Sequence, residues 1–500
     1  MSLRLILTFL FFFTVIPGFA AAPKLVVLIV GDQVRADYVE RYRQYLSTGG
    51  LGHFLQEGQD YSNAAYDYGA TKTSPGHTLL GSGLYPSESG IIGNEWWDRD
   101  QKKVVSAAEI IPGGKRVQLK WFRGTSLAQN VHARFPLARV IGISFKDRAA
   151  LLTPGSDADE AYWYDLKEKR FVSYGPSVPW LDEWNRSLTH LLQHFPGWDP
   201  LVPLDAALTA HFVSASNAYE KNLRPPPGLG LHFPHPILSE SAFADTPFTD
   251  TVLTDLAIHV IDQWHLGQNS SGIPDVLTIS YSGVDLVGHT FGPDSPETVD
   301  AFLRLDREIA RLREHLTLVC GSDCLWIFSA DHGVTPFPEY SRSQGLSAGR
   351  VALSSATLSK APWIANISVP WIYVDDDQIK ANHLSKQKAI DTLKTNILAL
   401  DGVDAVYDLR DCKKGHLPMT IAHSFDTPCE GKTSRNGDLY VVLKRYFIFS
   451  QVPYGTTHGQ PTLEDQRVPI LLEGHGVPHE TNTIPVSPKL VSQRILEALQ

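Results

Sequence analysis

The chain has 500 residues, of which 43% are hydrophobic and 20% are charged, so it is long enough for one large α/β core with insertions. Its formal net charge of −10 argues against nucleic-acid binding through a broadly basic surface, and we expect no nucleic-acid partner. A cationic binding site in this acidic chain has to be local.

The N-terminus has the three parts of a secretory signal peptide. Arg4 supplies a positive charge, residues 5–16 form an apolar stretch, and small residues from Gly18 to Ala22 offer a cleavage site. We therefore predict a signal peptide at residues 1–20, cleaved at about 20–22, and one domain at 23–500. An uncleaved membrane anchor is the alternative, but the apolar run is short for a bilayer span, so we expect no stable membrane anchor.

Three apolar runs, at residues 25–30, 276–280 and 325–330, each lead into potential metal ligands. All three have the pattern of buried strands, and the carboxyl ends of strands in an open α/β sheet converge on one edge. Each cluster taken alone also fits a turn or a helix cap. Taken together, the carboxylate and imidazole groups suit two zinc ions. With one later histidine, these candidate ligands are Asp32, Asp285, His289, Asp331, His332 and His458.

The segment from Ala70 to Pro86 contains a candidate nucleophile. Pro75 suits a first helical turn and the residues after it can continue a helix, which places Thr73 at the helix N-cap. A hydroxyl there faces unpaired backbone N–H groups and the positive end of the helix dipole, and both favour an anionic phosphoryl group. Helix capping alone is the structural alternative for this threonine. His77, one turn later, is expected only to orient the neighbouring backbone.

A cationic pair follows the next expected strand, at residues 140–144. Lys146 and Arg148 are separated by one acidic residue. A planar guanidinium fork and a lysine point charge suit the double negative charge of a phosphate monoester. The structural alternative is a solvated Lys-Asp-Arg turn.

Two insertions interrupt the alternation of strands and helices. The first, from about residue 153 to 250, is rich in aromatic residues and proline. Its His211, His232 and His235 lack carboxylate partners at ligand spacing, so we expect solvent or packing roles for them. The second, from about residue 341 to 450, is irregular and ends in strand-like segments at 439–442 and 446–450.

Two helices are expected between these insertions. Helical patterning covers residues 252–264. The clearest helix starts after Ser295, which is a suitable cap, with Pro296 at the first helical position and apolar residues along one face as far as Leu312.

The chain contains four cysteines, which fit an oxidising compartment. Four thiols allow three pairings. Pairing of neighbours in sequence, Cys320 with Cys324 and Cys412 with Cys429, closes the shortest loops and is the simplest prediction. A Cys-x-x-x-Cys metal site is the alternative.

Five segments, read in chain order, resemble the alkaline phosphatase superfamily: LVVLIVGDQVRADYV, TKTSPGHTLLGSGLYPSESGIIGNEWWD, VDLVGHTFGP, SADHGV and GTTHGQP. Within it the chain is most similar to the PafA-type bacterial alkaline phosphatases, with nucleotide pyrophosphatase/phosphodiesterases as cousins. The resemblance implies one catalytic domain, a three-layer α/β/α sandwich with a central, mostly parallel sheet, and a cap formed by the first insertion. It also implies export to the bacterial periplasm.

The same resemblance implies a role for each candidate residue. Thr73 is the phosphorylated nucleophile, and Asn94 donates from its side chain to a phosphoryl oxygen, although an Asn beside Gly would otherwise fit a turn. Lys146 and Arg148 contact the non-bridging oxygens of a monoester dianion, and the phosphodiesterase cousins typically lack this pair. The implied ligands of one zinc ion are Asp32, Thr73, Asp331 and His332, and those of the other are Asp285, His289 and His458.

Three functions are compatible with these patterns. The first is an exported, zinc-dependent alkaline phosphatase that hydrolyses small phosphate monoesters through a phosphothreonine intermediate and scavenges phosphate, and we expect it to be a monomer. The second is a type I phosphodiesterase or nucleotide pyrophosphatase. The third is a non-catalytic zinc- or phosphate-binding protein. A sulfatase does not fit, because the segment from Ser74 to His77 lacks the Cys/Ser-x-Pro-x-Arg motif.

Overall fold

The computed structural model describes residues 22–193, 197–204, 208, 228–269, 272–354, 357–358, 361–431 and 433–500. The predicted signal peptide, residues 1–20, lies outside these ranges, as does His211. Within them, no helix combines the length and the apolar character that a bilayer span requires.

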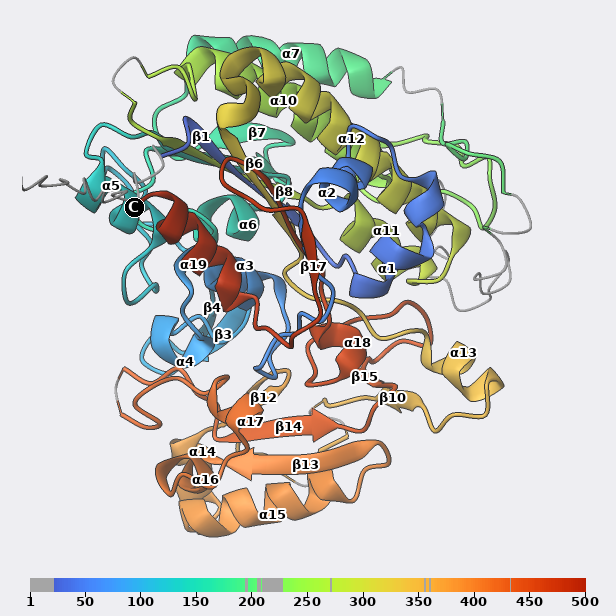
Figure 1. The fold of residues 1–500 in the computed structure, drawn as a ribbon. Helices are drawn as coiled ribbons and strands as arrows, with labels where there is room; N and C mark the ends of the chain where they lie inside the picture. The colour runs from blue at the N-terminus through green and yellow to red at the C-terminus, as the bar shows by residue number, and fades with distance from the viewer. Residues whose placement is uncertain are drawn as a thin grey trace, which may run out of the picture.

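A nine-stranded sheet forms the centre of the molecule (Figure 1). The five strands from β9 to β6 run parallel to their neighbours, whereas β16 and β7 flank them antiparallel. Every residue of β1, β5, β8 and β9 is buried, as continuous apolar runs predict for strands covered on both faces. In spatial order the strands are β17 (Glu480–Asn482), β2 (Gln59–Tyr61), β16 (Ile470–Gly474), β9 (Cys324–Ser329), β1 (Leu25–Gly31), β8 (Asp275–Tyr281), β5 (Val140–Ser144), β6 (Glu160–Asp165) and β7 (Arg170–Ser173).

Successive residues of β1 pack into two different hydrophobic cores, one on each face of the sheet. Leu25 and Val27 belong to one core, and Val26 and Leu28 belong to the other, because side chains alternate along a strand. Helices cover both faces (Figure 1), so the predicted three-layer α/β/α sandwich with a mostly parallel sheet is confirmed.

The helices divide between these two cores. Those that pack into the first core are α1 (Ala36–Arg41), α2 (Leu51–Glu57), α7 (Pro179–Gln193), α9 (Glu240–Phe243), α10 (Phe248–Trp264), α11 (Gly283–Phe291) and α12 (Pro296–Cys320). Those that pack mainly into the second are α3 (Thr73–Ser82), α5 (Leu127–Arg134), α6 (Asp147–Leu152) and α19 (Lys489–Ala498). The predicted start of α12 is confirmed, because Ser295 Oγ accepts the Thr298 N–H at 3.1 Å and Pro296 is the first helical residue.

The stretch predicted as the first insertion begins with two strands of the central sheet, β6 and β7, and continues with α7 and α9. Trp198, in this stretch, contacts the start of α12, because its Nε1 donates a hydrogen bond to Asp300 Oδ2 at 2.7 Å. His235 is buried, as a packing role requires, but its Nε2 lies 3.2 Å from Glu297 Oε1. The fold therefore supplies a carboxylate partner that the sequence spacing did not indicate.

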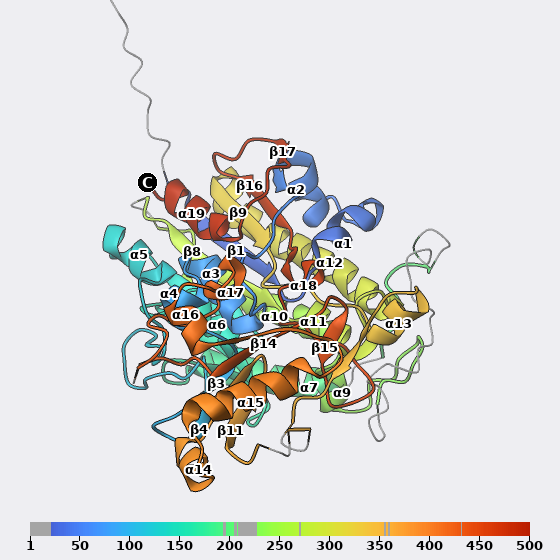
Figure 2. The same ribbon diagram turned by 90° about the horizontal axis from the view of Figure 1, so that it is seen from below.

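Residues 349–449 form a smaller lobe with its own hydrophobic core (Figures 1 and 2). A four-stranded antiparallel sheet, ordered β11-β12-β14-β13, packs against helices. The strand-like segments predicted at 439–442 and 446–450 are confirmed as β14 and β15. The lobe contains β10 (Gly349–Val351), β11 (Ile364–Ser368), β12 (Trp371–Val374), α14 (Asp376–Ala381), α15 (Lys386–Leu398), β13 (Val403–Asp408), α16 (Leu409–Lys413), α17 (Met419–Ala422), β14 (Leu439–Leu443) and β15 (Phe447–Phe449).

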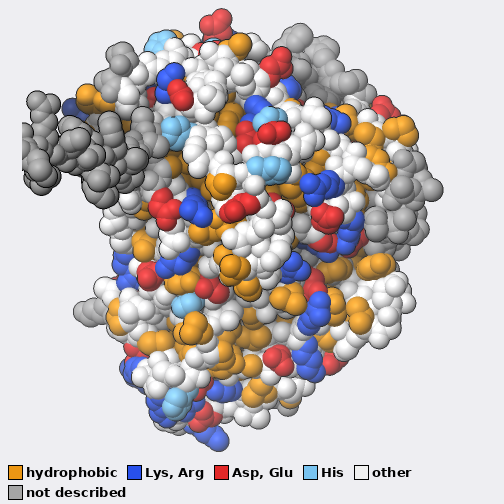
Figure 3. Space-filling model, in the orientation of Figure 1, with side chains coloured by type: hydrophobic (Ala, Val, Ile, Leu, Met, Phe, Trp, Pro, Cys, Tyr) orange, Lys and Arg blue, Asp and Glu red, His pale blue; other side chains and the backbone are white. Residues whose placement is uncertain are grey.

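Short elements and two disulfides complete the fold. The predicted disulfides, Cys320–Cys324 and Cys412–Cys429, are both formed. On the face that Figure 3 shows, the basic and acidic side chains of the described residues are interspersed. The remaining elements are η1 (Arg43–Tyr45), α4 (Pro86–Ser89), β3 (Glu95–Asp98), β4 (Lys103–Ser106), η2 (Gly321–Asp323), α13 (Pro338–Ser343) and α18 (Leu463–Gln466).

Candidate active site

Four neighbouring strands bring predicted site residues to one edge of the sheet. Asp32 follows β1, Asp331 follows β9, Lys146 lies two residues beyond β5, and Asp285 lies in α11 just beyond β8. These strands are adjacent and parallel, in the order β9-β1-β8-β5, so their carboxyl ends meet. Side chains that are far apart in the sequence therefore come within bonding distance of one another.

Two groups of side chains could each hold a metal ion. The Asp32 cluster comprises Asp32, Asp331 and His332, and the Asp285 cluster comprises Asp285, His332 and His458. His332 therefore belongs to both, whereas the sequence analysis gave it to the first ion alone. His289 lies beside the Asp285 cluster, with its Nε2 3.1 Å from Asp285 Oδ1.

The donor atoms of these clusters fit a divalent metal. Three buried atoms have no hydrogen-bond partner, Asp32 Oδ1, Asp331 Oδ2 and His332 Nε2, and His332 Nε2 lies 3.5 Å and 3.2 Å from the other two. Buried polar atoms without partners are costly, and a bound cation would satisfy all three. Carboxylate oxygen and imidazole nitrogen are the donors that zinc accepts.

The histidine rings present the correct nitrogen for metal binding. In each of the three rings Nδ1 bonds a backbone carbonyl: Thr456 O at 2.8 Å for His289, Gly333 O at 3.0 Å for His332, and Thr71 O at 2.7 Å for His458. A carbonyl only accepts, so Nδ1 carries the proton and the Nε2 lone pair is free. Burial lowers the pKa of both His332 and His458, which keeps these rings neutral at pH 7.

The carboxylates of the two clusters repel one another. Burial raises the pKa of Asp32 well above its ordinary value, and Asp285 and Asp331 add to the shift. Lys146 Nζ lies between two of these groups, 2.5 Å from Asp32 Oδ2 and 2.5 Å from Asp285 Oδ2. Burial alone would lower the pKa of Lys146, but Asp285 and Asp32 hold it above its ordinary value. The site thus stabilises cations.

Thr73 is the first residue of α3, not its N-cap. Lys72 takes the cap position, with extended backbone angles, and its carbonyl accepts the Gly76 N–H at 3.0 Å. The predicted boundary was therefore wrong by one residue. The reason is that none of the first-turn N–H groups has a partner within the helix, so proline fits the third helical position, where Pro75 lies, as well as the second, where the prediction put it. Thr73 is only 2% exposed and lies in the first turn of α3, where the Ser74 N–H is bonded to Asn94 and Pro75 has no N–H.

The start of α3 packs directly on the metal-ligand residues. A Cβ atom at Gly76 would lie 2.2 Å from Asp331 O, so only glycine permits this approach. Asn94 Oδ1 accepts the Ser74 N–H at 2.8 Å, which fixes the amide beside the helix end. The amide group of Asn94 keeps its N–H donors for another acceptor.

His77 links the nucleophile helix to the Asp32 cluster. Its Nδ1 bonds Thr73 O at 2.8 Å and lies 3.2 Å from Asp331 Oδ2, and its Nε2 bonds Ser280 Oγ at 2.7 Å. The expected contact with the neighbouring backbone is present. The contact with Asp331 was not expected.

Lys146 and Arg148 lie at the N-terminus of α6, where Lys146 is the cap residue. The Lys146 side chain is 8% exposed and that of Arg148 is 30% exposed. Among the described residues, Arg148 forms one long ion pair, with Asp147 Oδ1 3.8 Å from Nη1, and its buried Nε has no hydrogen-bond partner. Its guanidinium therefore retains donors for an anion.

The sequence analysis missed three buried residues that support the site. Asp250 Oδ1 accepts the N–H groups of Ser282 and Gly283, at 3.0 and 2.9 Å, and so caps α11. Asp465 also accepts a backbone N–H beside a ligand, because its Oδ2 accepts the Gly459 N–H, next to His458, at 2.9 Å. Gln33 contacts both clusters and is described below. Only the tertiary fold brings these residues to the ligands, so no local sequence signal marks them.

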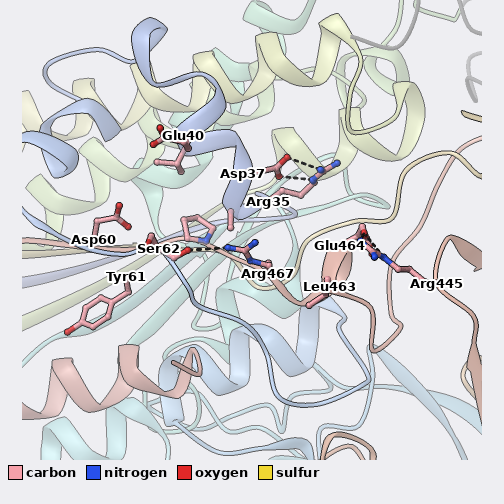
Figure 4. A pocket seen from close by; sticks show the side chains of 13 residues that line it. Arg35, Asp37, Glu40, Asp60, Tyr61, Ser62, Arg445, Leu463, Glu464 and Arg467 are labelled. Atoms are coloured by element: carbon pink, nitrogen blue, oxygen red, sulfur yellow. Dashed lines mark hydrogen bonds and ion pairs between the residues drawn. The ribbon is translucent and has the colours of Figure 1, made fainter. Parts of the chain in front are cut away.

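A separate cavity of about 560 Å³ lies beside β2 and α18 (Figure 4). The charges on its walls are largely paired, because Arg35 bonds Asp37 and Arg445 bonds Glu464. None of the predicted site residues lines it. The cavity therefore adds nothing to the site at the sheet edge.

Comparisons with known proteins agree with this arrangement. Alkaline phosphatase PhoV of Synechococcus elongatus is 28% identical over 497 residues, which cover 94% of this chain and 88% of PhoV. Alkaline phosphatase PafA of Elizabethkingia meningoseptica is 28% identical over 490 residues, which cover 91% of this chain and 87% of PafA. The crystal structure of wild-type PafA matches with a TM-score of 0.86 at 25% identity, over 96% of each chain.

A sequence model described as type I phosphodiesterase / nucleotide pyrophosphatase matches residues 26–463, a range that includes every predicted site residue from Asp32 to His458. The fold is the one found in the crystal structure of PafA. The chain therefore belongs to the type I phosphodiesterase / nucleotide pyrophosphatase family of the alkaline phosphatase superfamily, and it is PafA-like.

Proposed function

We propose that the protein is an exported alkaline phosphatase that hydrolyses small phosphate monoesters through a phosphothreonine intermediate, with two zinc ions bound. The relatives named alkaline phosphatases, PhoV and PafA, support hydrolysis of phosphate esters. The predicted signal peptide supports export to the periplasm, where the enzyme would release phosphate for uptake. Beyond β6 and β7, which belong to the central sheet, the predicted insertion up to about residue 250 would form a cap near the site.

One observation carries the choice of a monoester as substrate. Lys146 places a buried cation between the two ligand clusters, 2.5 Å from both Asp32 and Asp285. An ammonium group has three N–H donors, and two are used in these bonds, so one can meet a phosphoryl oxygen. A monoester dianion carries one more negative charge than a diester, and Lys146 with Arg148 would match it.

Thr73 would act as the nucleophile. Its Oγ forms a bond to phosphorus while the bond from phosphorus to the leaving oxygen breaks, which gives phosphothreonine and the free alcohol. A water molecule then attacks phosphorus, the bond to Thr73 Oγ breaks, and inorganic phosphate leaves. The Thr73 N–H at the start of α3 and the side-chain amide of Asn94 would donate to the oxygens on which charge is spread.

The metal ligands would be those named in the sequence analysis, with His332 within reach of both ions. Bound zinc would supply Lewis acidity, which lowers the pKa of the nucleophile and stabilises charge on the leaving oxygen. The carboxylates of Asp32, Asp285 and Asp331 would hold the positively charged ions in place. The positive charge of Lys146, which lies between Asp32 and Asp285, would reduce the repulsion between these two carboxylates.

Phosphodiester hydrolysis is the second candidate, because the matching family model is described by that activity. Measuring kcat/KM for p-nitrophenyl phosphate and for bis-p-nitrophenyl phosphate on the zinc-loaded protein distinguishes monoester from diester hydrolysis. We expect a higher value for the monoester. A higher value for the diester would favour the phosphodiesterase, and bound zinc with no turnover of either ester would indicate a non-catalytic binding protein.

A further inference from the structure

Gln33, the residue after Asp32, contacts both ligand clusters. Its backbone N–H donates to Asp331 Oδ1 at 3.1 Å, and its side-chain Nε2 donates to Asp285 Oδ1 at 2.6 Å. The residue is fully buried. Because a carboxylate only accepts, the amide must turn its NH₂ group toward Asp285. One residue therefore orients a carboxylate in each cluster.

The backbone of Gln33 is held in an unusual conformation. The Val34 N–H bonds Gly31 O at 3.2 Å, which closes a turn with Gln33 at its third position. Its φ of 67° lies in the left-handed region, where turns of this kind normally use Gly or Asn. A long side chain in this position is unfavourable unless its contacts compensate, and the bond to Asp285 is such a contact.

The facing helix leaves room for this amide. Gly288 lies inside α11, where glycine is a poor helix former. A Cβ atom at position 288 would lie 2.2 Å from Gln33 Oε1. Glycine at 288 and glutamine at 33 are therefore matched to each other, one residue before the predicted ligand His289.

We propose that Gln33 is a positioning residue whose side-chain amide sets the Asp285 carboxylate for metal binding. This inference rests on the proposed two-zinc site. The side chain contacts the Asp285 cluster alone, whereas the backbone N–H donates to Asp331 and is kept in every substitution except proline. Loss of the side-chain amide should therefore lower the affinity for the zinc ion of the Asp285 cluster and leave the affinity for the other zinc ion unchanged.

The test is transfer of zinc from the loaded enzyme to a chromophoric chelator, for the wild type and for Gln33→Met, which keeps the side-chain length but lacks the N–H donor. Removing a partner that orients a ligand typically weakens metal binding by about 10–100-fold. We expect the zinc ion of the Asp285 cluster to be released about 10–100-fold more readily from the variant. The affinity for the zinc ion of the Asp32 cluster should be unchanged. Gly288→Ala, which adds a methyl group against the amide, should give the same pattern.

Gln59→Met is the matched control. Gln59 is also buried, and its Nε2 bonds the carboxylate of Glu480 on β17, at the far edge of the sheet. This variant should keep both zinc affinities. Equal zinc release from Gln33→Met and the wild type would overturn the inference alone, as would equal weakening of both ions. A wild type that holds fewer than two zinc ions would overturn the proposed function and the inference together.

Discussion

The Asp32 and Asp285 clusters share His332 but are built differently. Asp32, Asp331 and His332 are fully buried and follow two adjacent strands, so the sheet fixes them. Asp285 and His458 come from a helix and a loop, and the neighbouring His289 side chain is 27% exposed. Ligands on a sheet edge need little further support, whereas ligands on α11 and a loop need contacts such as those of Gln33, Asp250 and Asp465.

This difference suggests a division of labour. The buried cluster lies against Thr73, because α3 packs on Asp331 at Gly76. The Asp285 cluster is nearer to solvent, because the His289 side chain beside it is 27% exposed.

The largest effect is expected at the nucleophile beside the buried cluster. Thr73→Ala removes the hydroxyl that accepts the phosphoryl group, so kcat/KM for p-nitrophenyl phosphate should fall by about 1,000-fold or more. Thr73→Ser keeps a hydroxyl and should retain far more activity. If the Ala variant keeps a tenth of wild-type turnover, Thr73 is not the nucleophile.

The second prediction concerns the residue that the clusters share. His332 Nε2 has one lone pair and so can bind one ion at a time. Because it lies 3.5 and 3.2 Å from the Asp32 and Asp331 carboxylates, His332→Ala should lose the ion of the Asp32 cluster. His289→Ala should lose the ion of the Asp285 cluster. Zinc content per chain after desalting measures this. His132→Asn is the control, since His132 is buried between Asp157 and Asp159, outside both clusters. A His332→Ala protein that keeps the full zinc content of the wild type would show that His332 is not a ligand.

The smallest expected effect concerns the residue that caps α11. Burial raises the pKa of Asp250 to about 7. A raised folded-state pKa stabilises the protein below the unfolded pKa of about 3.9, and this contribution is lost as pH rises toward 7, by at most about 1.4 kcal/mol per pH unit. Asp250→Asn keeps an oxygen acceptor for α11 but does not titrate.

We therefore expect the free energy of unfolding of the wild type to decrease, relative to Asp250→Asn, between pH 5 and pH 7. Urea denaturation at several pH values measures the difference. Identical pH dependence in the two proteins would show that Asp250 does not titrate in this range.

The parts of the fold that could be predicted are those that local sequence determines. The runs at β1, β5, β8 and β9 are continuously apolar because both faces of each strand are covered. Ser295 and Pro296 mark the start of α12 through cap chemistry that depends only on neighbours in sequence. The smaller lobe was not foreseen beyond β14 and β15, because a partly buried strand such as β11 shows no clear alternation and depends on distant partners.

The site could be predicted only in part for the same reason. Asp32, Asp285 and Asp331 directly follow or lie near strands, so the convergence of strand ends explains their meeting. Gln33 and Asp465 support the site through hydrogen bonds that form only in the folded chain, and no sequence pattern predicts these hydrogen bonds. The position of His332 between two clusters also depends on side-chain geometry, which spacing does not contain.

The central claim is that Lys146 and Arg148 select a phosphate monoester. The most direct test is the ratio of kcat/KM for p-nitrophenyl phosphate to kcat/KM for bis-p-nitrophenyl phosphate, in the wild type and in the double variant Lys146→Ala/Arg148→Ala. We predict that the wild type prefers the monoester and that the double variant lowers the ratio by about 100-fold or more, because the lost donors serve the extra negative charge. A ratio that is the same in both proteins would contradict the account.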